Sequence, residues 1–179
     1  MNSYGLLGYP LDHSWSEWVH TLLFECSKFP AKYTLHPVCP SELKALLEGP
    51  FPLDGCNVTI PYKTAVQPYM SRLSETAKAM GAVNVITRRG QTLAGDNTDG
   101  IGFRRMTRRR GWDLTGNVCL LGCGGAARTV AYEVLRRGGS LTVVARDLPS
   151  ESARQFEQQF ASYDRQFTLC GADQAAGRG

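Results

Sequence analysis

The sequence predicts an α/β protein with mainly parallel sheets, in which an N-terminal α/β domain is followed by part of a second, doubly wound domain. Strand-like and helix-like segments alternate along all 179 residues, without internal repeats or low-complexity tracts. A hydrophobic fraction of 42% is enough for packed cores in a chain of this length. A glycine-rich turn at Gly122 directly follows an apolar run, as expected near the start of a doubly wound domain. We therefore expect domains at 1–99 and 112–179, joined by a connecting helix at 100–111.

The first domain is predicted to open with a strand and a helix. The apolar run from Tyr4 to Gly8 predicts the strand, and a polar loop follows it. Trp15, Val19 and Leu22 then recur at helical spacing. Because a further strand pattern comes next, this part of the chain is predicted to form a β-α-β unit.

A second β-α-β unit is predicted to follow. Residues 32–38 alternate in polarity like a strand, and residues 56–60 form the next apolar strand. Between them, Ser41 is a suitable N-cap for a short apolar helix that ends at Gly49. Pro61 can open a helix at its first turn, which would place Lys63 near the carboxyl end of a strand, where ligands of open α/β sheets bind.

A helix and a hairpin are predicted to complete the first domain. Residues 74–80 have a helical pattern, and residues 83–87 and 91–94 read as two strands joined by a turn at Arg89-Gly90. A polar loop follows, and residues 100–110 are again helical in pattern.

The second domain is predicted to begin with a phosphate-binding turn. The apolar strand at 118–121 is followed directly by Gly122-Cys123-Gly124-Gly125-Ala126-Ala127 and then by a helix, which fits the pattern GxGxxA. Gly122 permits the tight turn, Gly124 lets backbone amides approach a pyrophosphate, and Ala127 allows close packing of helix on strand. The helix N-terminus favours an anion. This context predicts a Rossmann-type dinucleotide site, and the alternative is a tight turn that binds nothing.

Two charged residues follow the next predicted strand, at 141–145, where the adenosine ribose would lie. Arg146 would accommodate the 2′-phosphate of NADP, whereas Asp147 would accept hydrogen bonds from the free hydroxyl of NAD and repel that phosphate. Because Arg146 comes first, we favour NADP and keep NAD as possible. Either residue could also be an ordinary surface charge.

Composition excludes several classes of protein. Six cysteines are scattered without CxxC spacing, so the sequence suggests neither a metal site nor a disulfide framework, and we expect reduced, mostly buried thiols. No apolar run is long enough to span a membrane, and the first ten residues lack the features of a signal peptide. A cytoplasmic protein without a membrane partner is expected.

Much of the formal charge of +4 comes from a short basic stretch. Its members are Arg104, Arg105, Arg108, Arg109 and Arg110. Such a cluster could bind nucleic acid or phosphate. Because it lacks interleaved aromatic residues and any nucleic-acid motif, we interpret it as a solvated helix face and expect no nucleic-acid partner.

Polar residues gather at the predicted element ends of the first domain. They are Ser14 and Ser16, then Asn57, Thr59 and Lys63, then Asn84, and finally Asn97 and Asp99. Hydroxyls, amides, one cation and one carboxylate suit an oxygen-rich, anionic small molecule. Lys63 and Asp99 are the obvious acid-base pair, although each residue taken singly could simply cap a helix, shape a turn or face solvent.

The ordered set of these segments resembles the shikimate dehydrogenases, of the shikimate/quinate dehydrogenase family. The segments are Gly8-Tyr-Pro-Leu-Asp-His-Ser-Trp-Ser16, Asn57-Val-Thr-Ile-Pro-Tyr-Lys63, Gly81-Ala-Val-Asn84, Asn97-Thr-Asp99 and Gly122-Cys-Gly-Gly-Ala126. The resemblance covers nearly the whole chain, and five motifs in the right order are very improbable by chance. It implies reversible, NADPH-dependent reduction of 3-dehydroshikimate to shikimate in chorismate and aromatic amino acid biosynthesis, by a monomer or homodimer.

The resemblance also implies roles for residues of this chain. Ser14 and Ser16 would bind the substrate carboxylate, and the ring hydroxyls would be surrounded by Thr59, Lys63, Asn84 and Asp99. Lys63 would be the acid-base catalyst, oriented by Asp99. The pyrophosphate would lie on Gly122, Cys123, Gly124, Gly125 and Ala126, and Arg146 would meet the 2′-phosphate.

The sequence departs from the family pattern in several places. Glu17 replaces a proline, Val85 replaces a threonine, and Asp147 replaces a small polar residue, which weakens the preference for NADP. Family members also continue beyond the point where this chain stops, and residues 171–179 show no core pattern. We therefore expect a truncated member with weak or no turnover of its own. The alternatives are an NAD-dependent quinate or shikimate dehydrogenase and a non-catalytic module that binds a shikimate-like acid.

Overall fold

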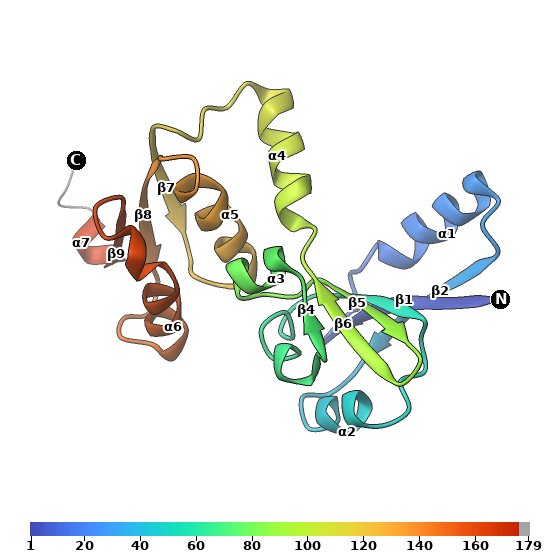
Figure 1. Ribbon diagram of the computed structural model, residues 1–179. Helices are drawn as coiled ribbons and strands as arrows, with labels where there is room; N and C mark the ends of the chain where they lie inside the picture. The colour runs from blue at the N-terminus through green and yellow to red at the C-terminus, as the bar shows by residue number, and fades with distance from the viewer. Residues whose placement is uncertain (176–179) are drawn as a thin grey trace. The chain divides into compact units, whose positions relative to one another are not determined.

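A computed structural model describes residues 1–175 of the chain (Figure 1). The chain divides into two compact units. The first comprises Met1–Lys78 and Ala82–Asn97, and the second comprises Ala79–Gly81 and the chain from Thr98 onward. Each unit contains its own sheet, so each is described by itself.

The first unit is built on a mixed sheet of six strands within residues 1–97. The strands are β1 (Asn2–Gly8), β2 (Ala31–Pro37), β3 (Gly55–Val58), β4 (Arg72–Leu73), β5 (Val85–Arg89) and β6 (Thr92–Asp96). Their order across the sheet is β2-β1-β3-β5-β6-β4. Strand β1 pairs in parallel with β2 and β3, and β4 pairs in parallel with β6, whereas β5 runs antiparallel to β3 and β6. Since β1 and β3 are parallel neighbours, the loops that follow them leave the sheet at the same edge.

Helices pack on both faces of this sheet. The helices are α1 (Ser16–Ser27), α2 (Leu43–Glu48), a 3-10 turn η1 (Gln67–Tyr69) and α3 (Glu75–Met80). Neighbouring residues of β1 point to opposite faces. Leu7 joins the main core, which contains α2, whereas Leu6 joins a smaller cluster against which Phe24 of α1 packs. Helices α1 and α2 therefore cover opposite faces of the sheet (Figure 1).

The second unit has an all-parallel sheet of three strands within residues 98–175, in the order β7-β8-β9. Its elements are α4 (Asp99–Arg110), β7 (Asn117–Leu121), α5 (Gly125–Leu135), β8 (Ser140–Ala145), α6 (Glu151–Phe160), η2 (Ala161–Tyr163), β9 (Phe167–Gly171) and α7 (Ala172–Ala175). Leu141 and Val143 of β8 are buried with Val134 of α5 and with Phe156 and Phe160 of α6. The alternation of parallel strands and helices confirms the predicted fold class.

Two local predictions were wrong. No α-helix follows Pro61; a series of turns leads to η1, because Pro68 lacks an N–H and limits any helix in this short segment. Ser41 does not cap α2. The cap position is Glu42, whose carboxylate accepts a hydrogen bond from the Cys39 N–H at 3.2 Å, and no side chain caps the helix.

The chain end carries no core residues in its described part, as expected, whereas the cysteines differ from expectation. Residues 172–175 form the short helix α7, in which residues 172–174 are exposed, and the rest of the predicted tail lies outside the described residues. Only two of the six thiols are buried, at Cys56 and Cys170. Burial raises the pKa of the Cys56 thiol to about 12, which keeps it protonated at neutral pH. No helix in residues 1–175 is long and apolar enough to cross a bilayer.

Replacing Phe156 with alanine is expected to lower the free energy of unfolding of the second unit by about 3–5 kcal/mol. The ring is fully buried, and its centroid lies 4.9 Å from that of Phe160. Urea denaturation followed by circular dichroism measures the change. Glu157→Ala, at an exposed position of the same helix, is the control and should change stability by less than about 0.5 kcal/mol. Similar losses in the two variants would contradict the packing role.

Candidate functional site

The loops that follow β1 and β3 meet at one edge of the first sheet. The Thr59 N–H donates to the Leu7 carbonyl at 2.9 Å, and the Tyr9 N–H donates to the Ile60 carbonyl at 3.2 Å. Gly8 lies between them, and a Cβ atom there would come within 2.5 Å of the Thr59 methyl group. A side chain at position 8 would therefore separate the two loops. This close approach brings Thr59 to the loop that carries Ser14.

Ser14 and Ser16 lie at the start of α1, and both are half-buried. The Ser14 N–H donates to the Leu11 carbonyl at 3.0 Å, and the Ser16 N–H donates to the Ser14 hydroxyl oxygen at 3.2 Å. These bonds form a tight turn between β1 and the helix. The structure thus holds the two serines next to each other at this sheet edge.

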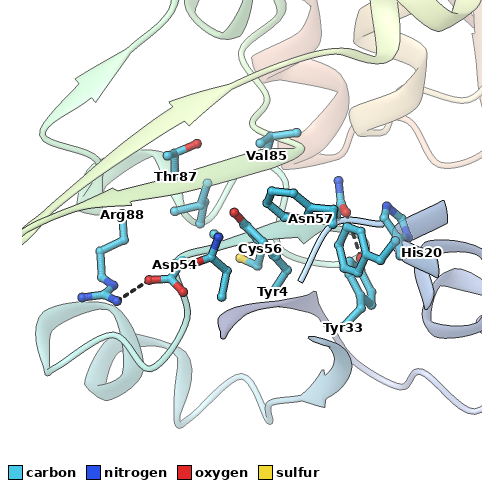
Figure 2. Close-up of a pocket in the computed structure, with 14 residues that line it drawn as sticks. Tyr4, His20, Tyr33, Asp54, Cys56, Asn57, Val85, Thr87 and Arg88 are labelled. Atoms are coloured by element: carbon cyan, nitrogen blue, oxygen red, sulfur yellow. Dashed lines mark hydrogen bonds and ion pairs between the residues drawn. The ribbon is translucent and has the colours of Figure 1, made fainter. Parts of the chain in front are cut away.

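A chain of contacts links Ser16 of α1 to Asn57 of β3. The His20 Nδ1 atom lies 2.8 Å from the Ser16 carbonyl oxygen, and the His20 ring stacks on Tyr33 with centroids 4.1 Å apart. The Tyr33 hydroxyl donates to Asn57 Oδ1 at 2.8 Å. Figure 2 shows His20, Tyr33 and Asn57 at one end of a hollow. The volume of this hollow is about 460 Å³. Sequence reasoning missed His20 and Tyr33, because they come from α1 and β2 and no spacing links them.

Lys63 and Asn84 are held close to the end of β3. The Val58 N–H donates to the Asn84 carbonyl at 2.8 Å, and the Val83 N–H donates to the Lys63 carbonyl at 2.7 Å. Asn84 is buried, with 8% exposure, whereas Lys63 is half-buried. The backbone bonds therefore bring together three of the predicted site residues, Thr59, Lys63 and Asn84.

Asp96, at the end of β6, accepts several hydrogen bonds at this edge of the sheet. Its carbonyl accepts from the Asn84 N–H at 3.0 Å, and its carboxylate accepts from the Asn97 N–H and from the Ser74 and Thr76 hydroxyls. Hydrogen bonding, chiefly from Ser74, lowers the pKa of the Asp96 carboxyl. Asn97 is buried, and its amide donates to the Ala82 carbonyl at 2.8 Å. Sequence reasoning had left Asp96 without a role.

The predicted acid-base pair divides between the two units. Lys63 belongs to the first unit, and Asp99 belongs to the second, where it is the first residue of α4. A carboxylate in the first turn of a helix interacts favourably with the helix dipole. Asp99 is half-buried there.

The glycine-rich turn has the form that a pyrophosphate requires. Gly122 has a φ of +95° and its N–H donates to the Val144 carbonyl at 2.8 Å, so the chain turns sharply at the end of β7. Gly124 is extended and precedes the first turn of α5. A Cβ atom at either glycine would meet nothing within 4 Å, so the space above the turn is open. The backbone amides of a helix N-terminus and open space together fit a pyrophosphate of a dinucleotide.

The other residues of the turn are arranged around these two glycines. Cys123 and Gly125 are half-buried and Ala126 is exposed. The Ser152 hydroxyl of α6 donates to the Cys123 carbonyl at 3.4 Å and ties the turn to that helix. Ala127 is buried against the second core.

Arg146 and Asp147 follow β8 and point into solvent. Their side chains are 93% and 75% exposed, and Arg146 Nε lies 3.5 Å from Asp147 Oδ2. An ion pair this exposed is weak and is readily exchanged for another partner. Either side chain is therefore available to a ligand that binds at the end of β8.

Comparison with known proteins finds similarity to shikimate dehydrogenases. Residues 6–86 match the family model described as the shikimate dehydrogenase substrate binding domain. Shikimate dehydrogenase (NADP(+)) of Salinibacter ruber is 44% identical over 147 residues, which are 79% of this chain and 52% of the relative. That of Symbiobacterium thermophilum is 42% identical over 146 residues, or 79% of this chain and 50% of the relative. The chain thus spans about half the length of the curated relatives it matches.

Solved structures agree with these sequence matches. A crystal structure of a shikimate dehydrogenase in complex with NADP+ superposes with a TM-score of 0.84 at 30% identity, covering 97% of this chain and 62% of that chain. The Thermus thermophilus shikimate 5-dehydrogenase, solved with NADP(H) and shikimate, gives a TM-score of 0.79 at 27% identity, covering 94% of this chain and 62% of that chain.

Stability of the first unit is expected to depend on pH through Asp96. Because its pKa is lowered in the folded state, the ionised carboxylate stabilises the fold above its ordinary pKa of about 3.9. That contribution is lost as the pH falls through the lowered, folded-state pKa. Ser74→Ala removes the chief donor, so the Asp96 pKa should rise and less stability should be lost on acidification.

Side-chain carboxyl titration by NMR measures this pKa directly. Ser71→Ala is the matched control, since the Ser71 hydroxyl bonds the Leu93 carbonyl rather than Asp96. An Asp96 pKa that is unchanged in Ser74→Ala would show that the hydrogen bond does not cause the shift.

Proposed function

Because residues 6–86 match the substrate binding domain of shikimate dehydrogenases, we propose that the chain belongs to this family and takes part in the NADPH-dependent reduction of 3-dehydroshikimate to shikimate. Its first unit would bind the substrate, and its second unit would contribute the pyrophosphate-binding part of a Rossmann domain. The observation that carries this proposal is the meeting of Thr59, Lys63 and Asn84 at the sheet edge that also bears Ser14. Hydroxyl, ammonium and amide groups gathered at one edge suit a small, oxygen-rich anion.

The proposed substrate site divides its tasks between two sets of side chains. Ser14 and Ser16 would donate to the substrate carboxylate, since their loop is closed by its own hydrogen bonds and presents two hydroxyls together. The ring hydroxyls would lie among Thr59, Lys63, Asn84 and Asp99. Both sets consist of donors and acceptors on element ends, which keeps their positions defined.

Lys63 is the proposed proton donor. Its ammonium group would transfer a proton to the carbonyl oxygen of 3-dehydroshikimate, which becomes the hydroxyl of shikimate, and in the reverse direction the neutral amine would take that proton back. Asp99 would orient the ammonium group. Reduction of the ketone also requires a hydride, which bound NADPH supplies.

The second unit is proposed to hold the cofactor through its glycine-rich turn. The residues concerned are Gly122, Cys123, Gly124, Gly125 and Ala126. The open space above the turn and the N-terminus of α5 support this role. Arg146 would pair with the 2′-phosphate of NADP after releasing Asp147, whereas Asp147 would favour NAD. We propose NADP, as the names of the relatives indicate for those proteins.

Domain assignments at 1–99, 100–111 and 112–179 remain part of this proposal. A second candidate function rests on the first unit, which forms a compact body of its own. Five of the six proposed substrate residues lie in the first unit, which has its own sheet and core. A module that binds a shikimate-like acid without turnover would need little more than that unit.

Lys63→Ala is expected to weaken shikimate binding by roughly 10- to 100-fold, because it removes a charge-assisted hydrogen bond. Isothermal titration of shikimate into the purified chain measures the affinity. Lys44→Ala, at an exposed position of α2, removes the same charge away from the site and should bind like the unaltered chain. Equal affinities in the Lys63 and Lys44 variants would overturn the proposed role of Lys63.

Absorbance of the reduced nicotinamide separates the candidate functions. A rise with shikimate and NADP that depends on Lys63 supports the dehydrogenase. A rise with quinate and NAD would instead support the related oxidation of quinate. Binding of shikimate without turnover or cofactor binding would identify the non-catalytic module.

Cofactor preference is expected to follow the two charges after β8. Arg146→Gln should weaken NADP binding about tenfold and leave NAD binding nearly unchanged, because only NADP carries the 2′-phosphate. Asp147→Asn should have the opposite effect on the ratio of the two affinities, since it removes the repulsion of that phosphate. Calorimetric titration with each cofactor tests both variants. Loss of both cofactors to the same extent in Arg146→Gln would refute a contact with the 2′-phosphate.

A further inference from the structure

The arginine-rich segment of α4 borders a hollow of about 480 Å³ in the second unit. Arg104, Arg105 and Arg108 line it from α4, and Arg137 lines it from the turn just beyond α5. Trp112, just beyond α4, completes the wall. These five residues are called the arginine hollow below. It has the size of a small-ligand site and no acidic residue lines it.

A buried carboxylate fixes two of these arginines. Glu133 is completely buried, and its Oε1 atom lies 2.6 Å from Arg104 Nη1. Its Oε2 atom lies 3.1 Å from Arg136 Nε and 3.7 Å from Arg137 Nη2. One negative charge therefore faces three positive ones, and the cluster keeps a surplus of two positive charges. Because the buried Glu133 carboxylate pairs with Arg104 and Arg137, the remaining N–H donors of these two side chains have defined directions.

The other arginines of α4 add positive charge without an ion-pair partner among the described residues. Among residues 1–175, no ion pair is found for Arg105, Arg108, Arg109 or Arg110. A second hollow of about 470 Å³ shares Arg105 and includes Arg109 and Arg110. The helix dipole contributes only about half a negative charge at the C-terminus of α4, which leaves most of this charge uncompensated. Two adjoining basic hollows suit a ligand with more than one phosphate group.

Trp112 gives the site an aromatic surface. Trp112 is 59% exposed, and its backbone N–H donates to the Thr107 carbonyl at 3.0 Å. Gly111, with a φ of +66°, ends α4 and its N–H donates to the Arg108 carbonyl at 3.2 Å. This helix cap fixes the backbone of Trp112 beside the arginines. An exposed indole held next to guanidinium groups is the combination by which proteins stack a base and bind its phosphate.

We propose that the arginine hollow binds nucleoside phosphates, with the base on Trp112 and the phosphates on the guanidinium groups. The same chemistry is offered by a free nucleotide and by a nucleotide unit of a single strand. The site lies apart from the glycine-rich turn, since that turn precedes the N-terminus of α5 whereas Arg137 follows its C-terminus. The sequence alone favoured a solvated helix face, because it did not reveal that Arg137 and Trp112 join the α4 arginines.

The test is fluorescence anisotropy of a labelled oligothymidylate of about ten nucleotides, titrated with the purified chain. The double variant Arg105→Gln/Arg108→Gln should bind at least about tenfold more weakly at 50 mM salt. Since each phosphate contact on a single strand contributes about 0.7 to the salt slope, that slope should fall by about 1.4. Trp112→Ala should weaken binding about fivefold or more, and Trp112→Phe should retain most of the affinity.

Arg154→Gln/Arg165→Gln is the matched control, because it removes the same charge from exposed positions outside the arginine hollow. It should change the affinity less than about twofold. If ATP displaces the labelled oligomer as completely as unlabelled oligomer does, the site is assigned to free nucleotides. If only unlabelled oligomer displaces it, the site is assigned to single strands. Either result supports the proposal. Absence of binding at 50 mM salt, or equal loss in the two double variants, would overturn it.

Discussion

The backbone of Asn84 joins the ends of two strands, and the candidate substrate site depends on this pair of hydrogen bonds. Its carbonyl accepts from Val58 at the end of β3, and its N–H donates to Asp96 at the end of β6. Both partners are strand ends, so the positions of the loops that follow are set by the register of the sheet. Thr59 and Asn97 are the next residues along these two strands. Loss of this bridge would affect every first-unit side chain that we assign to the ring hydroxyls.

Sequence periodicity predicted most elements of the first unit, because strand and helix patterns are local. The hairpin of β5 and β6 and the helices α1 and α3 are found where these patterns indicated. The segment after Pro61 was misjudged because two signals compete there. A proline favours the first turn of a helix, yet Pro68 follows too soon for a helix to extend. Such competition is settled by tertiary packing, here the burial of Tyr62 in the main core.

The candidate site was predictable to the extent that each residue stands at the end of an element. Its supporting contacts were not, since they join side chains from separate elements. His20, Tyr33 and Asn57 come from α1, β2 and β3, and only the order of strands in the sheet makes them neighbours. The glycine-rich turn was easier to predict from the sequence, because the turn itself requires a positive φ at Gly122.

Glu133 explains why α4 packs against α5. A carboxylate that is completely buried must be paired and hydrogen-bonded, because an isolated buried charge would be strongly destabilising. Arg104 of α4 is one of its partners, so separating α4 from α5 would leave this charge with fewer donors in a dry environment. The same pairing keeps the side chains of Arg104 and Arg137 from turning out into solvent. A contact that stabilises the unit therefore also keeps a dense positive charge beside Trp112, and a structural role and a binding role share one set of side chains.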